Sequence, residues 1–130
     1  EVFGGKLKNL DEVYHGVSSE IKVTAKSSLF NNIQQRFPAA RYHSWIVDKE
    51  DIPSCLEIIA VDSKENIMAL SHKSYNVKGV QFHPESILTE VGEQIIRNWL
   101  FDHQKMEINF PSAGNNAFNI NAIATKLLFC

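Results

Sequence analysis

The feature that most constrains this chain is an apolar strand pattern that stops at an imidazole, a proline and a carboxylate. Residues 77–86 read Val-Lys-Gly-Val-Gln-Phe-His-Pro-Glu-Ser. Side chains two apart on an extended backbone point the same way, and Pro84 biases His83 toward that geometry, so His83 and Glu85 can face one site. A carboxylate beside an imidazole stabilises the protonated ring, as a general base for a thiol or hydroxyl requires. Taken alone, a His-x-Glu pair is more often a surface turn.

The composition indicates an ordinary soluble globular domain. The chain has 130 residues, of which 44% are hydrophobic and 22% charged, enough for one core. A formal net charge of -2 gives no field that would attract nucleic acid or an anionic membrane. No apolar run approaches the roughly 18 residues of a membrane span. Cys55 and Cys130 lack metal-ligand spacing, which favours reduced thiols in the cytoplasm.

The order of elements predicts an α/β fold. Alternation predicts a hairpin with arms at residues 12–15 and 20–24, and residues 27–37 predict a helical turn or packed loop that ends before Pro38. Further strands are expected at residues 6–10, 40–47, 56–61, 67–71 and 77–82. The clearest helix follows Thr89, a suitable N-cap. Its apolar stripe, expected on the sheet, consists of Val91, Ile95, Ile96, Trp99 and Leu100.

Ligands of α/β proteins bind outside the carboxyl ends of strands, and His83 and Glu85 follow directly on such a strand. The amino-acid composition changes after residue 102. This change predicts that residues 103–130 form an extension or linker without identifiable chemistry. Because the chain opens without an initiator Met, on a sequence like the end of a helix, we expect it to be a fragment.

Residues 79–90, Gly-Val-Gln-Phe-His-Pro-Glu-Ser-Ile-Leu-Thr-Glu, resemble the glutamine amidotransferase domain that uses a Cys-His-Glu triad. Residues 1–102 are similar to the C-terminal two-thirds of that domain. The resemblance recurs at Phe3-Gly4-Gly5, Tyr14-His15-Gly16, Arg41-Tyr42-His43-Ser44, Leu56-Glu57, Ile67-Met68-Ala69 and His72-Lys73. The Arg-Tyr-His-Ser and Ser-Ile-Leu-Thr-Glu stretches favour the branch of anthranilate synthase component II and aminodeoxychorismate synthase glutaminases over relatives that make guanine nucleotides or carbamoyl phosphate.

This resemblance implies a flavodoxin-like fold with a mixed, mostly parallel sheet flanked by helices, here lacking its N-terminal strands. It also implies glutamine hydrolysis without a cofactor: a cysteine thiolate attacks the side-chain amide, with His83 as base and Glu85 as its orienting acid. Ser44 and Trp45 match positions where the family holds glutamine through backbone groups. The family usually has Leu where this chain has Trp45, a change that a main-chain contact could survive.

The nucleophile is the main departure from the family. The family places its cysteine on a glycine-flanked turn, and the resemblance would put that turn upstream of Glu1. Cys55 opens a strand without flanking glycines, which predicts a structural thiol, and Cys130 is expected to be inert. The resemblance implies that ammonia passes to a chorismate-using synthase subunit, component I, which makes anthranilate for tryptophan or aminodeoxychorismate for folate.

The main alternative is that residues 1–130 are an inactive fragment or a partner-binding module. A serine or metal hydrolase built on His83 and Glu85 has little support, because the chain lacks a nucleophile elbow and a ligand cluster. His43, close to the predicted site, is as easily a structural histidine as a substrate contact. Structural or solvated positions are favoured for His15 and His72, and no metal site is expected from the scattered histidines.

Overall fold

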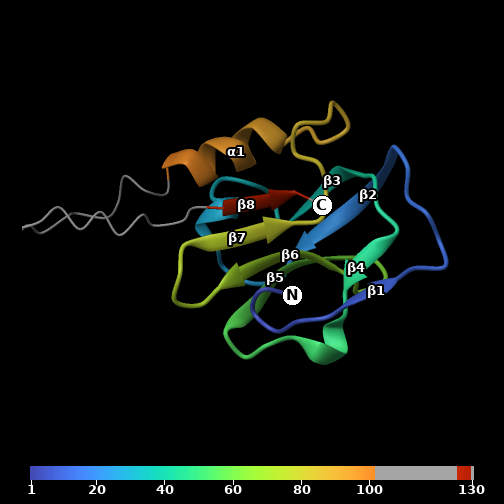
Figure 1. Ribbon diagram of the computed structural model, residues 1–130. Coiled ribbons are helices and arrows are strands. Elements are labelled where there is room, and N and C mark those ends of the chain that lie inside the picture. The colour runs from blue at the N-terminus through green and yellow to red at the C-terminus, as the bar shows by residue number, and fades with distance from the viewer. Residues whose placement is uncertain (102–125, 130) are drawn as a thin grey trace, which may run out of the picture.

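A computed structural model describes residues 1–101 and 126–129 of the chain, the last four as backbone (Figure 1). The predicted extension over residues 103–130, with His103 and Cys130, therefore lies outside the described residues except for one short strand. The strands are β1 (Leu7–Asn9), β2 (Val17–Val23), β3 (Arg36–Arg41), β4 (Trp45–Val47), β5 (Leu56–Asp62), β6 (Ile67–His72), β7 (Val77–Val80) and β8 (Lys126–Phe129). The helices are the short η1 (Ser28–Phe30) and η2 (Lys49–Asp51) and the longer α1 (Gly92–Phe101).

The strands form a six-stranded sheet in the order β3-β2-β5-β6-β7-β8 and a two-stranded sheet of β1 and β4. Only the β7–β8 pairing is parallel among those described. The sheet is mixed, as predicted, but the prediction that it is mostly parallel is wrong for this part of the chain. Residues 63–66 and 73–76 join successive strands, and such short connections allow antiparallel hairpins whereas a parallel crossover needs a dozen or more residues.

The first half of the chain departs most from the predicted elements. The predicted hairpin is instead a single strand, β2, which begins directly after Gly16; this glycine has a φ of +69° and leads the chain into the strand. β3 begins at Arg36 and runs through Pro38, whereas we predicted a helical turn or packed loop up to residue 37. Because β3 is the edge strand, it can accept a residue that has no N–H for a further neighbour.

The predicted strand over residues 40–47 is divided between the two sheets. β3 ends at Arg41 and pairs with β2, whereas β4 begins at Trp45 and pairs with β1. Residues 42–44 form the connection. This break matters for the site, because it is the connection that approaches His83.

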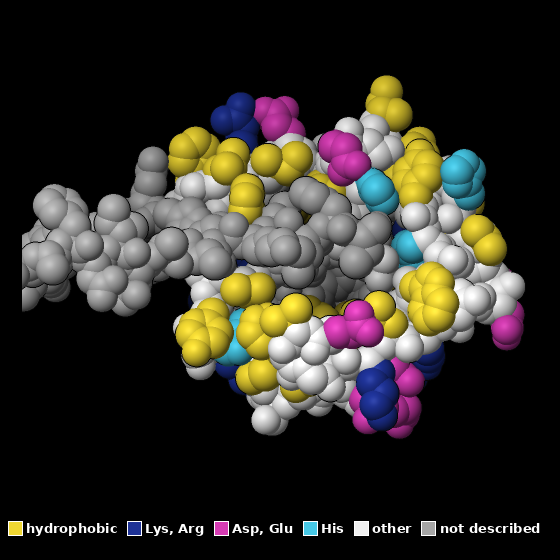
Figure 2. Space-filling model, viewed as in Figure 1, with side chains coloured by type: hydrophobic (Ala, Val, Ile, Leu, Met, Phe, Trp, Pro, Cys, Tyr) yellow, Lys and Arg dark blue, Asp and Glu magenta, His cyan; other side chains and the backbone are white. Residues whose placement is uncertain are grey.

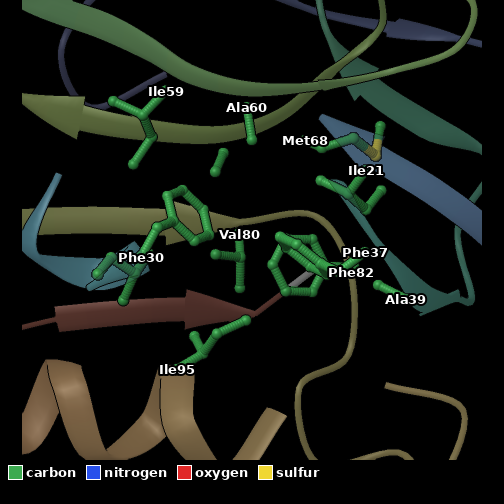
Figure 3. Close-up of a cluster of buried hydrophobic side chains, with 12 residues drawn as sticks. Ile21, Phe30, Phe37, Ala39, Ile59, Ala60, Met68, Val80, Phe82 and Ile95 are labelled. Carbon is green, nitrogen blue, oxygen red and sulfur yellow. The ribbon is translucent and has the colours of Figure 1, made fainter. Parts of the chain in front are cut away.

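Within the described residues, a hydrophobic core is formed by the six-stranded sheet, η1 and α1 (Figure 3). Phe82, directly before His83, is buried and meets Phe37 edge-on at 5.7 Å between ring centroids. Val91, Ile95 and Trp99 pack on this core, which confirms that part of the predicted helix stripe. Leu100 is 52% exposed, so the stripe is narrower than predicted.

Candidate functional site

His83 and Glu85 face one another in the turn that follows β7. The Nδ1 atom of His83 lies 2.7 Å from Oε1 of Glu85, which confirms that the two side chains share one site. Partial burial tends to raise the pKa of Glu85, but the hydrogen bonds from His83 and from its own backbone N–H outweigh this effect. The net pKa of Glu85 therefore lies below the ordinary glutamate value. A carboxylate that stays ionised beside the ring can orient the imidazole.

The other ring nitrogen of His83 is available for proton transfer. Its Nε2 atom is buried, and within residues 1–101 it has no hydrogen-bond partner. The ring packs edge-on against Tyr42, with ring centroids 5.0 Å apart. The carboxylate on one side and the aromatic ring on the other leave the orientation of the imidazole little freedom.

The backbone of His83 is tied to the end of β3 through Thr89. His83 donates its N–H to the carbonyl oxygen of Ala40 at 2.9 Å. The Thr89 hydroxyl donates to the carbonyl of His83 at 2.7 Å and accepts from the N–H of Ala40 at 3.0 Å. Thr89 is therefore not the N-cap that we predicted. Its buried hydroxyl instead bridges the carbonyl of His83 and the N–H of Ala40, two backbone groups that each need a hydrogen-bond partner.

The first residue of α1 packs directly against Pro84. A Cβ atom placed on Gly92 would lie 1.7 Å from the carbonyl oxygen of Pro84. This close approach demands glycine, although the position is helical. The helix and the turn that carries His83 and Glu85 are thus held as one unit.

A buried charge cluster supports the connection that leads from β3 to β4. Arg41 is 1% exposed, and its Nη1 donates to Oδ2 of Asp62 at 2.7 Å. The guanidinium carbon lies 3.6 Å from the centroid of the Tyr14 ring, an arrangement typical of a cation–π contact. Asp62 also accepts from the backbone N–H groups of Lys64 and Asn66. Burial tends to raise the pKa of Asp62, but the hydrogen bonds from the side chain and backbone of Asn66, the charge of Arg41 and the backbone of Lys64 lower it overall.

His43 extends this cluster toward Trp45. Nε of Arg41 donates to Nε2 of His43 at 3.0 Å, and Nδ1 of His43 lies 3.1 Å from the carbonyl oxygen of Trp45. Burial, together with the positive charge of Arg41, lowers the pKa of His43 to about 4. His43 is therefore neutral near neutral pH, and both of its ring nitrogens already have hydrogen-bond partners.

The two predicted glutamine-binding residues lie where this connection enters β4. Ser44 is half-buried, and its carbonyl accepts from the N–H of Leu10 at 2.7 Å. Trp45 is 55% exposed, so its ring faces solvent while its main chain is paired with β1. Figure 2 shows histidine side chains beside hydrophobic ones at this end of the molecule, where β2, β3 and β4 meet. The assignment of Ser44 and Trp45 to substrate binding stays a prediction.

Cys55 lies at the opposite end of the sheet from His83. It directly precedes β5, whose first residue, Leu56, pairs with His72 at the end of β6. β7 begins beside that end of β6 and runs away from it before His83 follows. The register thus separates Cys55 from His83, and its assignment as a structural thiol stays a prediction.

Sequence reasoning missed several residues that build the site, namely Tyr14, Arg41, Asp62 and Gly92. The one available signal was Arg-x-His at residues 41–43, a spacing that allows both side chains on one side of an extended segment. No group of three or more potential metal-ligating side chains occurs within the described residues. In the same part of the chain, no helix combines the length and the apolar character needed to span a membrane.

Comparisons with known proteins show which family the chain resembles. Residues 1–103 match the family model described as glutamine amidotransferase class-I. A Haemophilus influenzae protein named as an anthranilate synthase component II is 48% identical over 100 residues, covering 77% of this chain and 52% of that protein. The aminodeoxychorismate/anthranilate synthase component 2 of Bacillus subtilis is 38% identical over 105 residues, covering 81% of this chain and 54% of that protein.

Among solved structures, a protein described as part of a GMP synthase from Thermoplasma acidophilum aligns with a TM-score of 0.67 at 21% identity. The alignment covers 74% of this chain and 47% of that chain, and it supports the fold alone. The family model covers most of the chain. The chain therefore belongs to the class-I glutamine amidotransferase family. It spans about half the length of the curated relatives named above.

Proposed function

We propose that this chain contributes the acid–base half of a glutaminase that hydrolyses glutamine to glutamate and ammonia. One observation carries the proposal: His83 is held by Glu85 through Nδ1, while its Nε2 is buried without a hydrogen-bond partner among residues 1–101. A general base oriented by a carboxylate needs such a free nitrogen to take a proton from a nucleophile.

In the proposed mechanism, Nε2 of His83 takes the proton of a cysteine thiol, and the thiolate attacks the amide carbon of glutamine. His83 returns the proton to the departing ammonia, and water then releases glutamate from the thioester. Glu85 orients the ring throughout, and the main chain of Ser44 and Trp45 holds the substrate. We place the thiol outside the described residues, because Cys55 lies at the other end of the sheet.

We further propose that residues 1–102 are the C-terminal part of the amidotransferase domain and that residues 103–130 are an extension or linker. The whole protein would work in the cytoplasm beside a chorismate-using synthase partner, without cofactor, metal, nucleic acid or membrane. The component II relatives support anthranilate as the product. Aminodeoxychorismate is the second candidate, because the Bacillus subtilis relative is named for both.

Co-purification from the source cells tests this assignment. The captured synthase subunit should convert chorismate, supplied with ammonia, to anthranilate. Formation of aminodeoxychorismate would select the second candidate. A captured partner that makes neither product would refute the proposed pathway.

A glutaminase assay separates an active chain from a partner-binding module. Residues 1–130 alone should release no ammonia from glutamine, and Cys55→Ala should change nothing, because loss of a nucleophile removes several orders of magnitude in rate. Ammonia release that Cys55→Ala abolishes would overturn the proposed location of the thiol. Circular dichroism with a melting transition establishes that the assayed chain is folded.

A further inference from the structure

Arg41, Asp62 and His43 form a buried chain of hydrogen bonds that is separate from the contact between His83 and Glu85. It starts at the β5–β6 turn with Asp62, passes through the guanidinium of Arg41 to His43, and ends on the carbonyl of Trp45. Arg41 and Asp62 have side chains only 2% exposed. A buried ion pair is weak evidence for a gain in stability, since the cost of desolvation offsets most of the attraction.

The chemistry of the donors sets the tautomer of His43. An arginine side chain can only donate hydrogen bonds, so Nε2 of His43 must accept from Nε of Arg41. The proton of the neutral ring is then on Nδ1, which donates to the Trp45 carbonyl. The low pKa of His43 keeps this neutral form populated near pH 7.

We propose that Arg41, Asp62 and His43 are positioning residues that fix the main chain of Ser44 and Trp45 beside His83, so that it presents the substrate glutamine to the catalytic base. This inference rests on the proposed glutaminase function. Two contacts support the placement: the segment begins where Ala40 bonds to the backbone of His83, and Tyr42 packs on the His83 ring. The Trp45 side chain is largely exposed and contributes little to holding this residue in place. The hydrogen bond from His43 to the backbone carbonyl of Trp45 anchors it instead.

Two substitutions at His43 separate positioning from a purely structural role. In His43→Asn, the amide nitrogen takes the place of Nδ1 and keeps the donor to Trp45 but loses the acceptor for Arg41. In His43→Gln, the amide oxygen takes the place of Nε2 and keeps the acceptor for Arg41 but loses the donor to Trp45. A structural role that only satisfies the buried guanidinium favours His43→Gln, whereas positioning favours His43→Asn.

The readout is binding of L-glutamine to the 130-residue chain, followed by two-dimensional ¹H–¹⁵N NMR at the amides of Ser44 and Trp45. We expect His43→Asn to bind within about threefold of the unmodified chain and His43→Gln to bind about tenfold or more weakly, the loss typical of one hydrogen bond. The reverse order, or equal losses in two folded variants, would overturn the positioning role.

A second measurement on the unmodified chain does not depend on either variant. Long-range ¹H–¹⁵N spectra of the ring should show His43 as the neutral tautomer with its proton on Nδ1, and an Nε2-protonated ring would overturn the inference. If this tautomer is found but L-glutamine shifts neither amide, the substrate role of the segment and the proposed function fail together. If glutamine binds and the tautomer is wrong, only the positioning role fails.

Discussion

At the scale of single residues, the site depends on which nitrogen of each histidine is occupied. Nδ1 of His83 is committed to Glu85, which leaves Nε2 for proton transfer. Both nitrogens of His43 are committed, to Arg41 and to Trp45. Of these two histidines, only His83 therefore keeps a ring nitrogen without a hydrogen-bond partner among residues 1–101.

The hydrogen bond between His83 and Glu85 predicts a change in the titration of the carboxylate. His83→Phe keeps an aromatic ring against Tyr42 but removes the donor that lowers the pKa of Glu85. The pKa of Glu85 should then rise, as ¹³C NMR of the side-chain carboxyl can measure. The pKa of Asp48, which is lowered mainly by the backbone N–H of Glu50, is an internal control that should not move. An unchanged pKa of Glu85 would contradict the pairing.

The low pKa of His43 predicts that acid destabilises the fold. Between pH 6.5 and about 4 the unfolded chain binds a proton at His43 and the folded chain does not, so the free energy of unfolding falls as the pH falls. At one pKa unit per 1.36 kcal/mol, the loss from His43 between pH 6.5 and 5 is about 2 kcal/mol. Urea unfolding across this range measures it. His43→Asn should flatten the profile, and parallel profiles would refute the assignment.

At the scale of elements, the turn that carries His83 and Glu85 is held by its neighbours rather than by its own residues. α1 contacts it through Gly92, and β3 is bound to it by the hydroxyl of Thr89. These contacts explain why a turn that contains Pro84 can present two polar side chains in one fixed geometry. They also make glycine necessary at a helical position, where it is ordinarily unfavourable.

Gly92→Ala tests this packing. Helix propensity alone predicts that alanine stabilises by about 1 kcal/mol. The overlap with the carbonyl of Pro84 predicts the opposite sign, because overpacking costs about 1–3 kcal/mol or more and here involves backbone. Urea unfolding gives the sign, and NMR should show displaced signals of His83 and Glu85. Gly79→Ala in β7 is the matched control, since its Cβ would meet nothing within 4 Å. A stabilised Gly92→Ala variant would contradict the contact.

At the scale of the whole molecule, the Arg41–Asp62 pair connects the end of the edge strand β3 with the β5–β6 turn. The two side chains lie 21 residues apart in sequence and are almost completely buried. Other ion pairs, such as Arg36–Glu20, lie at the surface with side chains 57% and 55% exposed. The Arg41–Asp62 pair is therefore removed from water, whereas the Arg36–Glu20 pair remains solvated.

Asp62→Asn should destabilise the whole fold by about 3–5 kcal/mol, because it leaves the buried guanidinium of Arg41 without its counter-charge. Glu20→Gln removes the exposed partner of Arg36 and should cost less than about 1 kcal/mol. Urea unfolding monitored by circular dichroism compares the two variants. Equal losses would mean that burial of the Arg41–Asp62 pair has no special consequence.

The sequence by itself determined the features that neighbouring residues control. The spacing of His83 and Glu85, the strands β5, β6 and β7 and the inward face of α1 all follow from local periodicity and turn chemistry, and they are present in the structure. The separated motifs were also sufficient to indicate the amidotransferase family, which the family model confirms.

Only the tertiary structure decided how distant segments share the site. The passage of β3 through Pro38 depends on its edge position, and the break before β4 depends on a second sheet. Thr89 meets the backbone of Ala40 across 49 residues, so its choice between capping a helix and joining two segments could not be read from neighbouring residues. Burial and hydrogen bonding between such segments, which local preferences do not encode, bring Arg41, His43 and Asp62 together.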